Sequence, residues 1–141
     1  MSELLPDLIA WIIDHGYAVD EGDDIFWNFI PDVPDEVIVL YEYDSVMSPI
    51  KSSKTALRFV QVTYRASQDS VAKNGCDLLF KLFMNLGREG TPEEDDEDGI
   101  VILPSGRWAV IKPRQVPFKI EIDEQLRHIW GFNVGITTNP D

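Results

Sequence analysis

Val37–Tyr41 is the feature of this chain that most restricts its fold. The five residues are all apolar or aromatic, and a turn-forming segment, Pro31-Asp32-Val33-Pro34-Asp35, stands shortly before them. A short, continuous apolar run bounded by turn signals is typical of a strand that is buried on both faces. We therefore expect a strand here that is covered on both sides.

Alternating apolar and polar residues predict two further strands. Leu57–Arg65 places Val60, Val62 and Tyr64 on one face and Gln61, Thr63 and Arg65 on the other. Val116–Asp123 alternates in the same way, which predicts a half-buried strand.

The remaining strand predictions depend on glycine, proline and aromatic residues. In Trp130–Thr137 one face is bulky and the other nearly bare, which predicts either an edge strand or close packing against another surface. The aromatic-rich segment Ile25–Ile30 predicts a short strand. Ile100–Leu103 and Arg107–Ile111 flank Pro104-Ser105-Gly106, which is typical of a type I turn between two strands.

Helical periodicity predicts two helices. The first extends from about Glu3 to His15, with Ser2 as its N-cap and Trp11 off the apolar stripe. The second follows a predicted N-cap at Ser67 and ends at Gly87. Its predicted apolar stripe contains Val71, Gly75, Leu78, Leu79, Leu82, Phe83 and Leu86. Gly75 on this stripe predicts a close approach of the helix to the sheet.

The order of these elements predicts an α+β fold. We expect both helices on one face of a single, mainly antiparallel and possibly mixed sheet. At 141 residues the chain fits one domain, 1–141. We expect two irregular segments in it, a mobile loop at about 44–55 and an acidic loop at about 89–99.

The composition excludes several classes of protein. The net charge of −13 and the pI near 4.4 disfavour non-specific binding to nucleic acid or to anionic membranes. No apolar run is long enough to span a bilayer, and the first residues lack the basic start of a secretory signal. A single cysteine, Cys76, excludes an intramolecular disulfide and a cysteine-based zinc cluster.

The charge is unevenly distributed along the chain. Residues 1–50 contain twelve acidic residues and no Lys or Arg, whereas residues 51–141 contain all twelve basic residues. Folding can mix these charges without functional consequence. Alternatively, an acidic surface of one molecule meets a basic surface of the next, in a head-to-tail contact that builds rings or filaments. The candidate interface charges for such a contact are Asp23, Asp24, Arg58 and Arg65.

Motifs for catalysis or cofactor binding are missing from the sequence. The two histidines, His15 and His128, lie far apart, and the glycines form neither a P-loop nor a dinucleotide fingerprint. Cys76 follows the spacing of Ala72, Leu79 and Phe83, which predicts a buried core residue. We therefore predict no catalytic residue, no metal and no cofactor.

The acidic run also fails as a calcium loop. Glu94, Asp96, Asp98 and Gly99 fit positions one, three, five and six of an EF-hand, but Ser105 stands where the bidentate glutamate belongs. Four aromatic side chains could form a base-stacking platform, yet the basic groove that such a platform needs is missing; they are Trp27, Phe29, Trp108 and Trp130.

Several segments resemble a family of small phage virion proteins, the minor capsid or tail-completion proteins that look like tail terminators. The resemblance starts at Ile30-Pro31-Asp32-Val33-Pro34-Asp35 and Val39-Leu40-Tyr41-Glu42-Tyr43, and continues through Leu57–Arg65 and the helix after it. It is strongest near the C-terminus, at Pro117-Phe118, Asp123-Glu124, Arg127 and Trp130-Gly131-Phe132-Asn133. The acidic run and Ile25–Ile30 depart from the family's pattern.

The resemblance implies a non-catalytic protein that forms a ring, typically of six subunits, on the last turn of a phage tail tube. Such a ring ends tube growth and joins the tail to the head, so the implied partners are further copies of this chain, the tail tube protein and the head-neck proteins. The implied location is the tail or neck of the virion, after assembly in the host cytoplasm. No membrane and no sequence-specific nucleic-acid binding are expected.

In such a ring, the acidic run is the candidate lining of the bore, where it would repel DNA, or a contact with a neighbouring ring. It consists of Glu93, Glu94, Asp95, Asp96, Glu97 and Asp98.

Two other functions stay open from the sequence. An acidic monomeric inhibitor that mimics DNA would capture a basic partner in a salt-sensitive way. A small enzyme would have a deep pocket with His128 or His15 beside a carboxylate.

Overall fold

The computed structural model describes residues 4–16, 22, 24–47, 56–85 and 100–138. This part of the chain forms two helices and seven strands, which confirms the α+β class. Their bounds are α1 Leu4–Asp14, β1 Ile25–Trp27, β2 Val37–Met47, β3 Ala56–Ala66, α2 Asp69–Asn85, β4 Ile100–Ile102, β5 Trp108–Pro113, β6 Phe118–Ile122 and β7 His128–Thr138.

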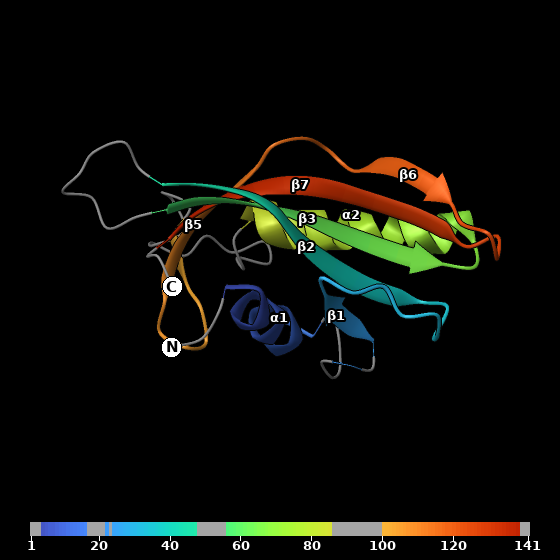
Figure 1. The fold of residues 1–141 in the computed structure, drawn as a ribbon, viewed down its shortest axis with the longest axis horizontal. Coiled ribbons are helices and arrows are strands. Elements are labelled where there is room, and N and C mark those ends of the chain that lie inside the picture. Colours follow the sequence, from blue (N-terminus) through green and yellow to red (C-terminus); the bar gives the residue numbers. More distant parts are fainter. Residues whose placement is uncertain (1–3, 17–21, 23, 48–55, 86–99, 139–141) are drawn as a thin grey trace.

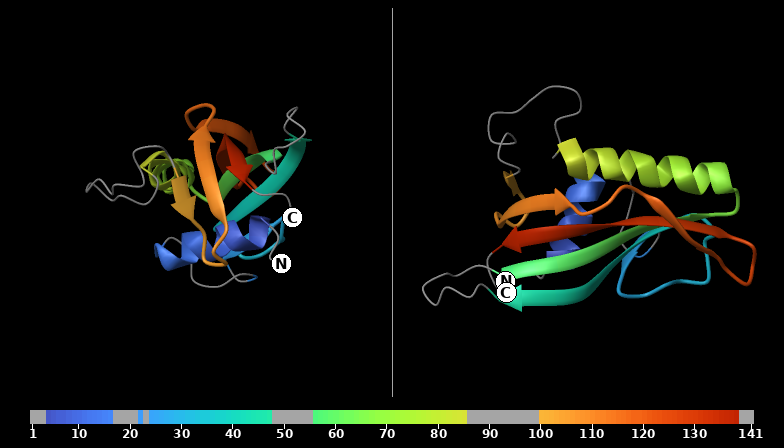
Figure 2. Two further views of the ribbon diagram at one scale, coloured as in Figure 1. Left: turned by 90° about the vertical axis from the view of Figure 1, so that its left-hand side faces the viewer. Right: turned by 90° about the horizontal axis from the view of Figure 1, so that it is seen from above.

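All seven described strands belong to one curled sheet (Figures 1 and 2). The order across the sheet is β1-β2-β3-β7-β5-β4, and β6 pairs with the start of β7. β1 is parallel to β2, whereas the other described pairings are antiparallel, so the sheet is mixed. Because β7 pairs with β3 on one side and with β5 and β6 on the other, the prediction of an edge strand at Trp130–Thr137 is wrong.

Both helices pack on the same face of this sheet, as predicted. α1 lies against β1 and β2, α2 lies against β3 and β7, and the two helices meet where Trp11 and Phe83 pack edge to face at 5.3 Å. Val60 and Val62 on β3 point into the same apolar cluster. Trp11 is buried, so its predicted place off the apolar stripe is wrong: α2 covers that side of α1.

The buried stripe of α2 is displaced from the predicted one. Val71 and Leu78 are exposed. The buried residues of α2 instead recur every three or four positions on the side of Cys76; they are Ala72, Cys76, Leu79, Leu82 and Phe83. Gly75 keeps its predicted role. A Cβ atom there would lie 2.5 Å from the ring of Tyr64 on β3, so only glycine lets the helix approach this closely. Leu86 and Gly87 lie outside the described residues.

The N-terminus of α2 differs from its prediction. The carbonyl of Gln68 accepts the first intrahelical hydrogen bond, from the Ala72 N–H at 3.1 Å, so Gln68 is the N-cap. Ser67, the predicted cap, instead donates its hydroxyl to Asp35 at 3.3 Å. Ser2 lies outside the described residues.

Two strand predictions need correction. β2 continues to Met47, so the loop predicted at about 44–55 starts later, and residues 48–55 lie outside the described part of the chain. β6 is exposed from Lys119 onward, so it is not half-buried. The turn between β4 and β5 is confirmed, because the Gly106 N–H donates to the Leu103 carbonyl at 2.8 Å.

Candidate functional site

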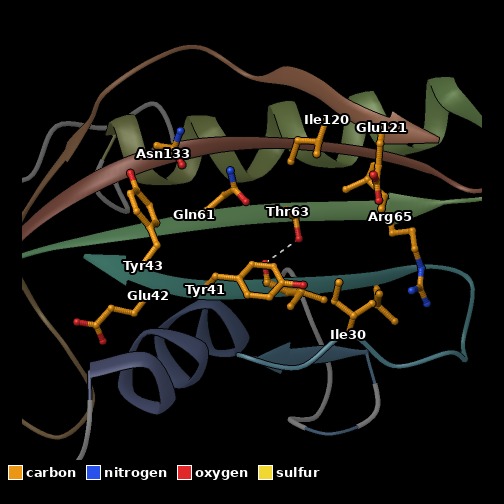
Figure 3. A pocket seen from close by; sticks show the side chains of 13 residues that line it. Ile30, Tyr41, Glu42, Tyr43, Gln61, Thr63, Arg65, Ile120, Glu121 and Asn133 are labelled. Atoms are coloured by element: carbon orange, nitrogen blue, oxygen red, sulfur yellow. Dashed lines mark hydrogen bonds between the residues drawn. The ribbon is translucent and has the colours of Figure 1, made fainter. Parts of the chain in front are cut away.

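A groove of about 660 Å³ crosses the face of the sheet that the helices leave uncovered (Figure 3). Its floor is the helix-free face of β2, β3 and β7, and β6 and the segment before β2 form its sides. Most of its lining is apolar or aromatic, and the volume is in the range of binding pockets. The lining residues are Ile30, Val37, Val39, Tyr41, Glu42, Tyr43, Gln61, Thr63, Arg65, Ile120, Glu121, Ile129 and Asn133.

A row of three polar side chains crosses this groove. Tyr41 on β2 is in register with Gln61 on β3, and Gln61 is in register with Asn133 on β7. The side chains of Tyr41 and Gln61 make no hydrogen bond to any described residue, and the buried Oδ1 of Asn133 has no donor. Burial is the main cause that raises the pKa of Tyr41. A molecule in the groove could supply a partner to the buried Oδ1 of Asn133, because buried polar groups are normally paired.

The apolar part of the groove depends on Gly131. A Cβ atom at this position would lie 2.8 Å from Cδ1 of Ile120 and 2.8 Å from the Val62 carbonyl oxygen. The side chain of Ile120 on β6 therefore packs closely on the bare face of β7 at Gly131.

Arg65 closes one end of the groove from inside the molecule. Its side chain is on the helix-free face, yet the residue is only 2% exposed. Its guanidinium donates to the backbone carbonyls of Pro31, Pro34 and Asp35, at 2.8, 2.6 and 3.1 Å. Burial, together with the nearby charge of Arg127, lowers the pKa of Arg65.

Arg127 holds the same loop from the turn between β6 and β7. It donates to the carbonyl oxygen of Asp32, to Oδ1 of Asp35 at 3.4 Å, and to Oδ2 of Asp123 at 2.8 Å. Desolvation raises the pKa of Asp123, but the hydrogen bonds from Arg127 and Gln125 outweigh it and lower that pKa. The loop 31–35 is thus fixed by two arginines that are 62 positions apart.

Three of the predicted interface charges lie in the described residues. Arg58 makes a two-pronged salt bridge to Glu42, at 2.6 and 2.7 Å, on the rim of the groove. Arg65 is committed to its own chain, and Asp24 precedes β1. Asp23 and the run Glu93–Asp98 lie outside the described residues. The interface role of these charges therefore stays a prediction.

The histidine and carboxylate that a small enzyme would need do meet, but outside the groove. Nδ1 of His128 lies 3.4 Å from Oδ1 of Asp69, which also accepts from Lys119 and Trp130, each at 2.9 Å. Those two hydrogen bonds lower the pKa of Asp69. Cys76 is fully buried, and burial raises the pKa of its thiol to about 12. Among the described residues, no three potential metal ligands converge.

Sequence reasoning missed the groove. The signal that could have indicated it is the pair of alternating strands, because Gln61, Thr63 and Arg65 were already predicted to share one face of β3. The sequence does not indicate the register of β2, β3 and β7, which aligns this face with Tyr41 and Asn133.

No protein-family model and no curated protein matches the chain. No helix in the described part of the chain has the length and apolar character to cross a membrane.

Proposed function

We propose that this chain is a non-catalytic structural protein of a phage virion, similar to a tail terminator. It forms a ring at the head-proximal end of the tail tube, ends tube growth and joins the tail to the head. The observation that carries the proposal is the separation of charge between the two sides of the sheet. Such a subunit attracts a second copy head to tail, and that contact can close a ring.

The charge separation can be followed along the strand order. From Asp24 to Tyr43, on the β1–β2 side, there are five acidic residues and no basic one. From Trp108 to Ile122, over β5, β6 and the segment between them, there are three basic residues and one acidic residue, Glu121. These two sides lie on opposite sides of β3 and β7 (Figure 1).

The segments that carry the family resemblance also support the proposal. Ile30–Asp35 and Asp123–Arg127 are about 90 positions apart in the chain, and Arg127 donates hydrogen bonds within both. These two resembling segments therefore belong to one hydrogen-bonded unit.

Light scattering over a concentration series, with negative-stain images of the same fractions, tests the ring. We expect rings of about six subunits, near 97 kDa, six times the 16.1 kDa of one chain. A monomer at every concentration would contradict a ring that forms in solution and would favour the acidic inhibitor.

The role at the tail needs its own assay. Added to polymerising tail tube protein of the same phage, the chain should give short tubes of uniform length. Tube lengths that do not change would contradict termination, whether or not rings form in solution.

The acidic run Glu93–Asp98 is proposed to line the bore or to contact a neighbouring ring. Replacement of all six acids by serine separates this role from ring assembly. We expect the variant to form rings of normal size but fewer infective particles. Infectivity equal to that of the native protein would remove both roles from the run.

A further inference from the structure

We infer that the groove is the receptor for a second copy of this chain, and that the segment Arg114–Pro117 of the neighbour inserts its Val116 there. This inference rests on the proposed function, because it names the contact that would build the ring. It is carried by two features of one sheet: an open groove with unpaired polar groups, and a basic protrusion with an exposed apolar side chain that leaves the sheet beside Asn133.

The protrusion follows from the register of β7. Pro113 pairs with Val134 and Phe118 pairs with Gly131, so four residues on one strand face only two on the other. The surplus has to leave the plane of the sheet. In Figure 1 this segment, 114–117, arches away from β7. Val116 is 68% exposed there.

The arch is anchored at its base, so it is preorganised. The Arg114 N–H donates to the Asn133 carbonyl at 2.7 Å, and the side chain of Asn133 donates to Oε1 of Gln115 at 3.2 Å. The Arg114 guanidinium lies over the ring of Phe59 at 4.5 Å. A preorganised segment loses little conformational freedom on binding.

The groove offers what this arch lacks. Its apolar lining can cover Val116, and the unpaired Tyr41 hydroxyl and Gln61 amide can bond to exposed peptide groups of the arch. Of the two carboxylates that line the groove, Glu42 is already paired with Arg58, which leaves the charge of Glu121 to face the arch. The arch is flanked by Lys112 and Arg114, so the charges are complementary.

The positions of the two features favour a second copy over a different partner. The groove extends from the exposed Ile30 and Tyr43 on the β2 side to Asn133 on β7, and the arch leaves the sheet beside Asn133. A copy that inserts its arch into one neighbour keeps its own groove available to another. Contacts of this head-to-tail kind continue until they close a ring.

Two variants test the contact separately. Val116→Asp disables the arch, and Gln61→Lys places a cation in the groove, where it repels the incoming Arg114. Each should weaken self-association about 100-fold or more, as expected for a central interface residue. Val33→Asp is the matched control, because Val33 is an equally exposed valine, at 72%, outside the groove. It should leave self-association within about twofold of the native value.

Mixing the two disabled variants gives the most specific result. Gln61→Lys still has its arch and Val116→Asp still has its groove, so together they can make one contact and no more. Light scattering should therefore show a dimer in the mixture, near 32 kDa, and monomers of each variant alone. Normal assembly by either variant, or a mixture that stays monomeric, would overturn the inference.

Cross-linking provides a second test if a disabled variant does not fold. Val116→Cys and Tyr43→Cys, each mixed with the other, should join through a short bis-maleimide, whereas neither should join to itself. Equal cross-linking of one variant to itself would overturn the head-to-tail geometry. If native rings form but depend on neither residue, this contact is wrong while the ring proposal stands. Native protein that is monomeric throughout would overturn this contact and leave the tube-length assay to decide the function.

Discussion

The two faces of the central strands differ in chemistry although the same strands build both. On the helix face, β3 and β7 present Val60, Val62, Phe132 and Val134, all fully buried. On the groove face, the alternate positions apart from Ile129 carry polar, charged or very small residues; they are Gln61, Thr63, Arg65, Gly131 and Asn133.

The difference shows that the two faces of the same strands can have separate roles, one in stability and one in binding. Helices cover one face, and apolar packing holds it together. The other face is held at one end by Arg65 and its three backbone carbonyls, and is open in the middle. We expect stability to reside mainly in the helix face and self-association in the groove face.

Phe132→Ala is expected to produce the largest loss of stability. Phe132 packs edge to face on Phe80 and Phe83, at 5.3 and 5.5 Å, so its removal leaves a cavity. The free energy of unfolding in urea should fall by about 3–5 kcal/mol. The control on the groove face is Ile120→Ala, 37% exposed, which should cost less than about 1 kcal/mol. Equal losses would contradict the division between the faces.

Arg65→Met tests the closed end of the groove face. It removes the donors of three hydrogen bonds to carbonyls, and we expect a loss of about 2–3 kcal/mol in the free energy of unfolding. Arg65→Lys keeps the charge but not the planar fork, so it should restore only part of that loss.

Arg58→Met is the comparison for this prediction. It breaks the two-pronged salt bridge to Glu42, whose partners are only 13% and 18% exposed, so it should also cost about 1–3 kcal/mol. If Arg65→Met unfolds at the same urea concentration as the native chain, the loop 31–35 does not need its arginine.

The helix face could be predicted from the sequence to a large extent. The alternation in Leu57–Arg65, the apolar run at Val37–Tyr41 and the glycine at position 75 predicted local features that the structure confirms. The error in the stripe of α2 has a physical cause. Val71 and Leu78 fit the helical period, but the sheet meets the helix on the side of Ala72 and Cys76.

The groove could not be predicted in the same way. Its polar row exists only because β2, β3 and β7 pair in one register, and no local pattern contains that information. Arg65 was predicted as an interface charge, since charged residues are rarely buried. Its burial depends on carbonyls that are 30 or more positions away, which the sequence around it does not indicate.

At alkaline pH we expect a smaller change in the free energy of unfolding, to which the helix face contributes. Cys76, on the helix face, has its pKa raised by burial to about 12, against 9.0 in the unfolded chain. The folded state therefore holds the thiol proton more tightly. The stability that this adds is complete below pH 9 and is lost as the pH rises from 9 towards 12. At pH 10 the loss should be about 1 kcal/mol.

Cys76→Ala isolates this effect. The substitution leaves a small cavity at every pH, so the readout is the change in the free energy of unfolding between pH 8 and pH 10, which should be smaller in the variant than in the native chain. Tyr41 on the groove face titrates in both proteins and cancels. An identical pH dependence would mean that the thiol is accessible in the folded state. A smaller pH dependence in the variant would show that the Cys76 thiol ionises only when the helix face unfolds. Tyr41 is half-buried over the open groove, so its hydroxyl should ionise in the folded protein.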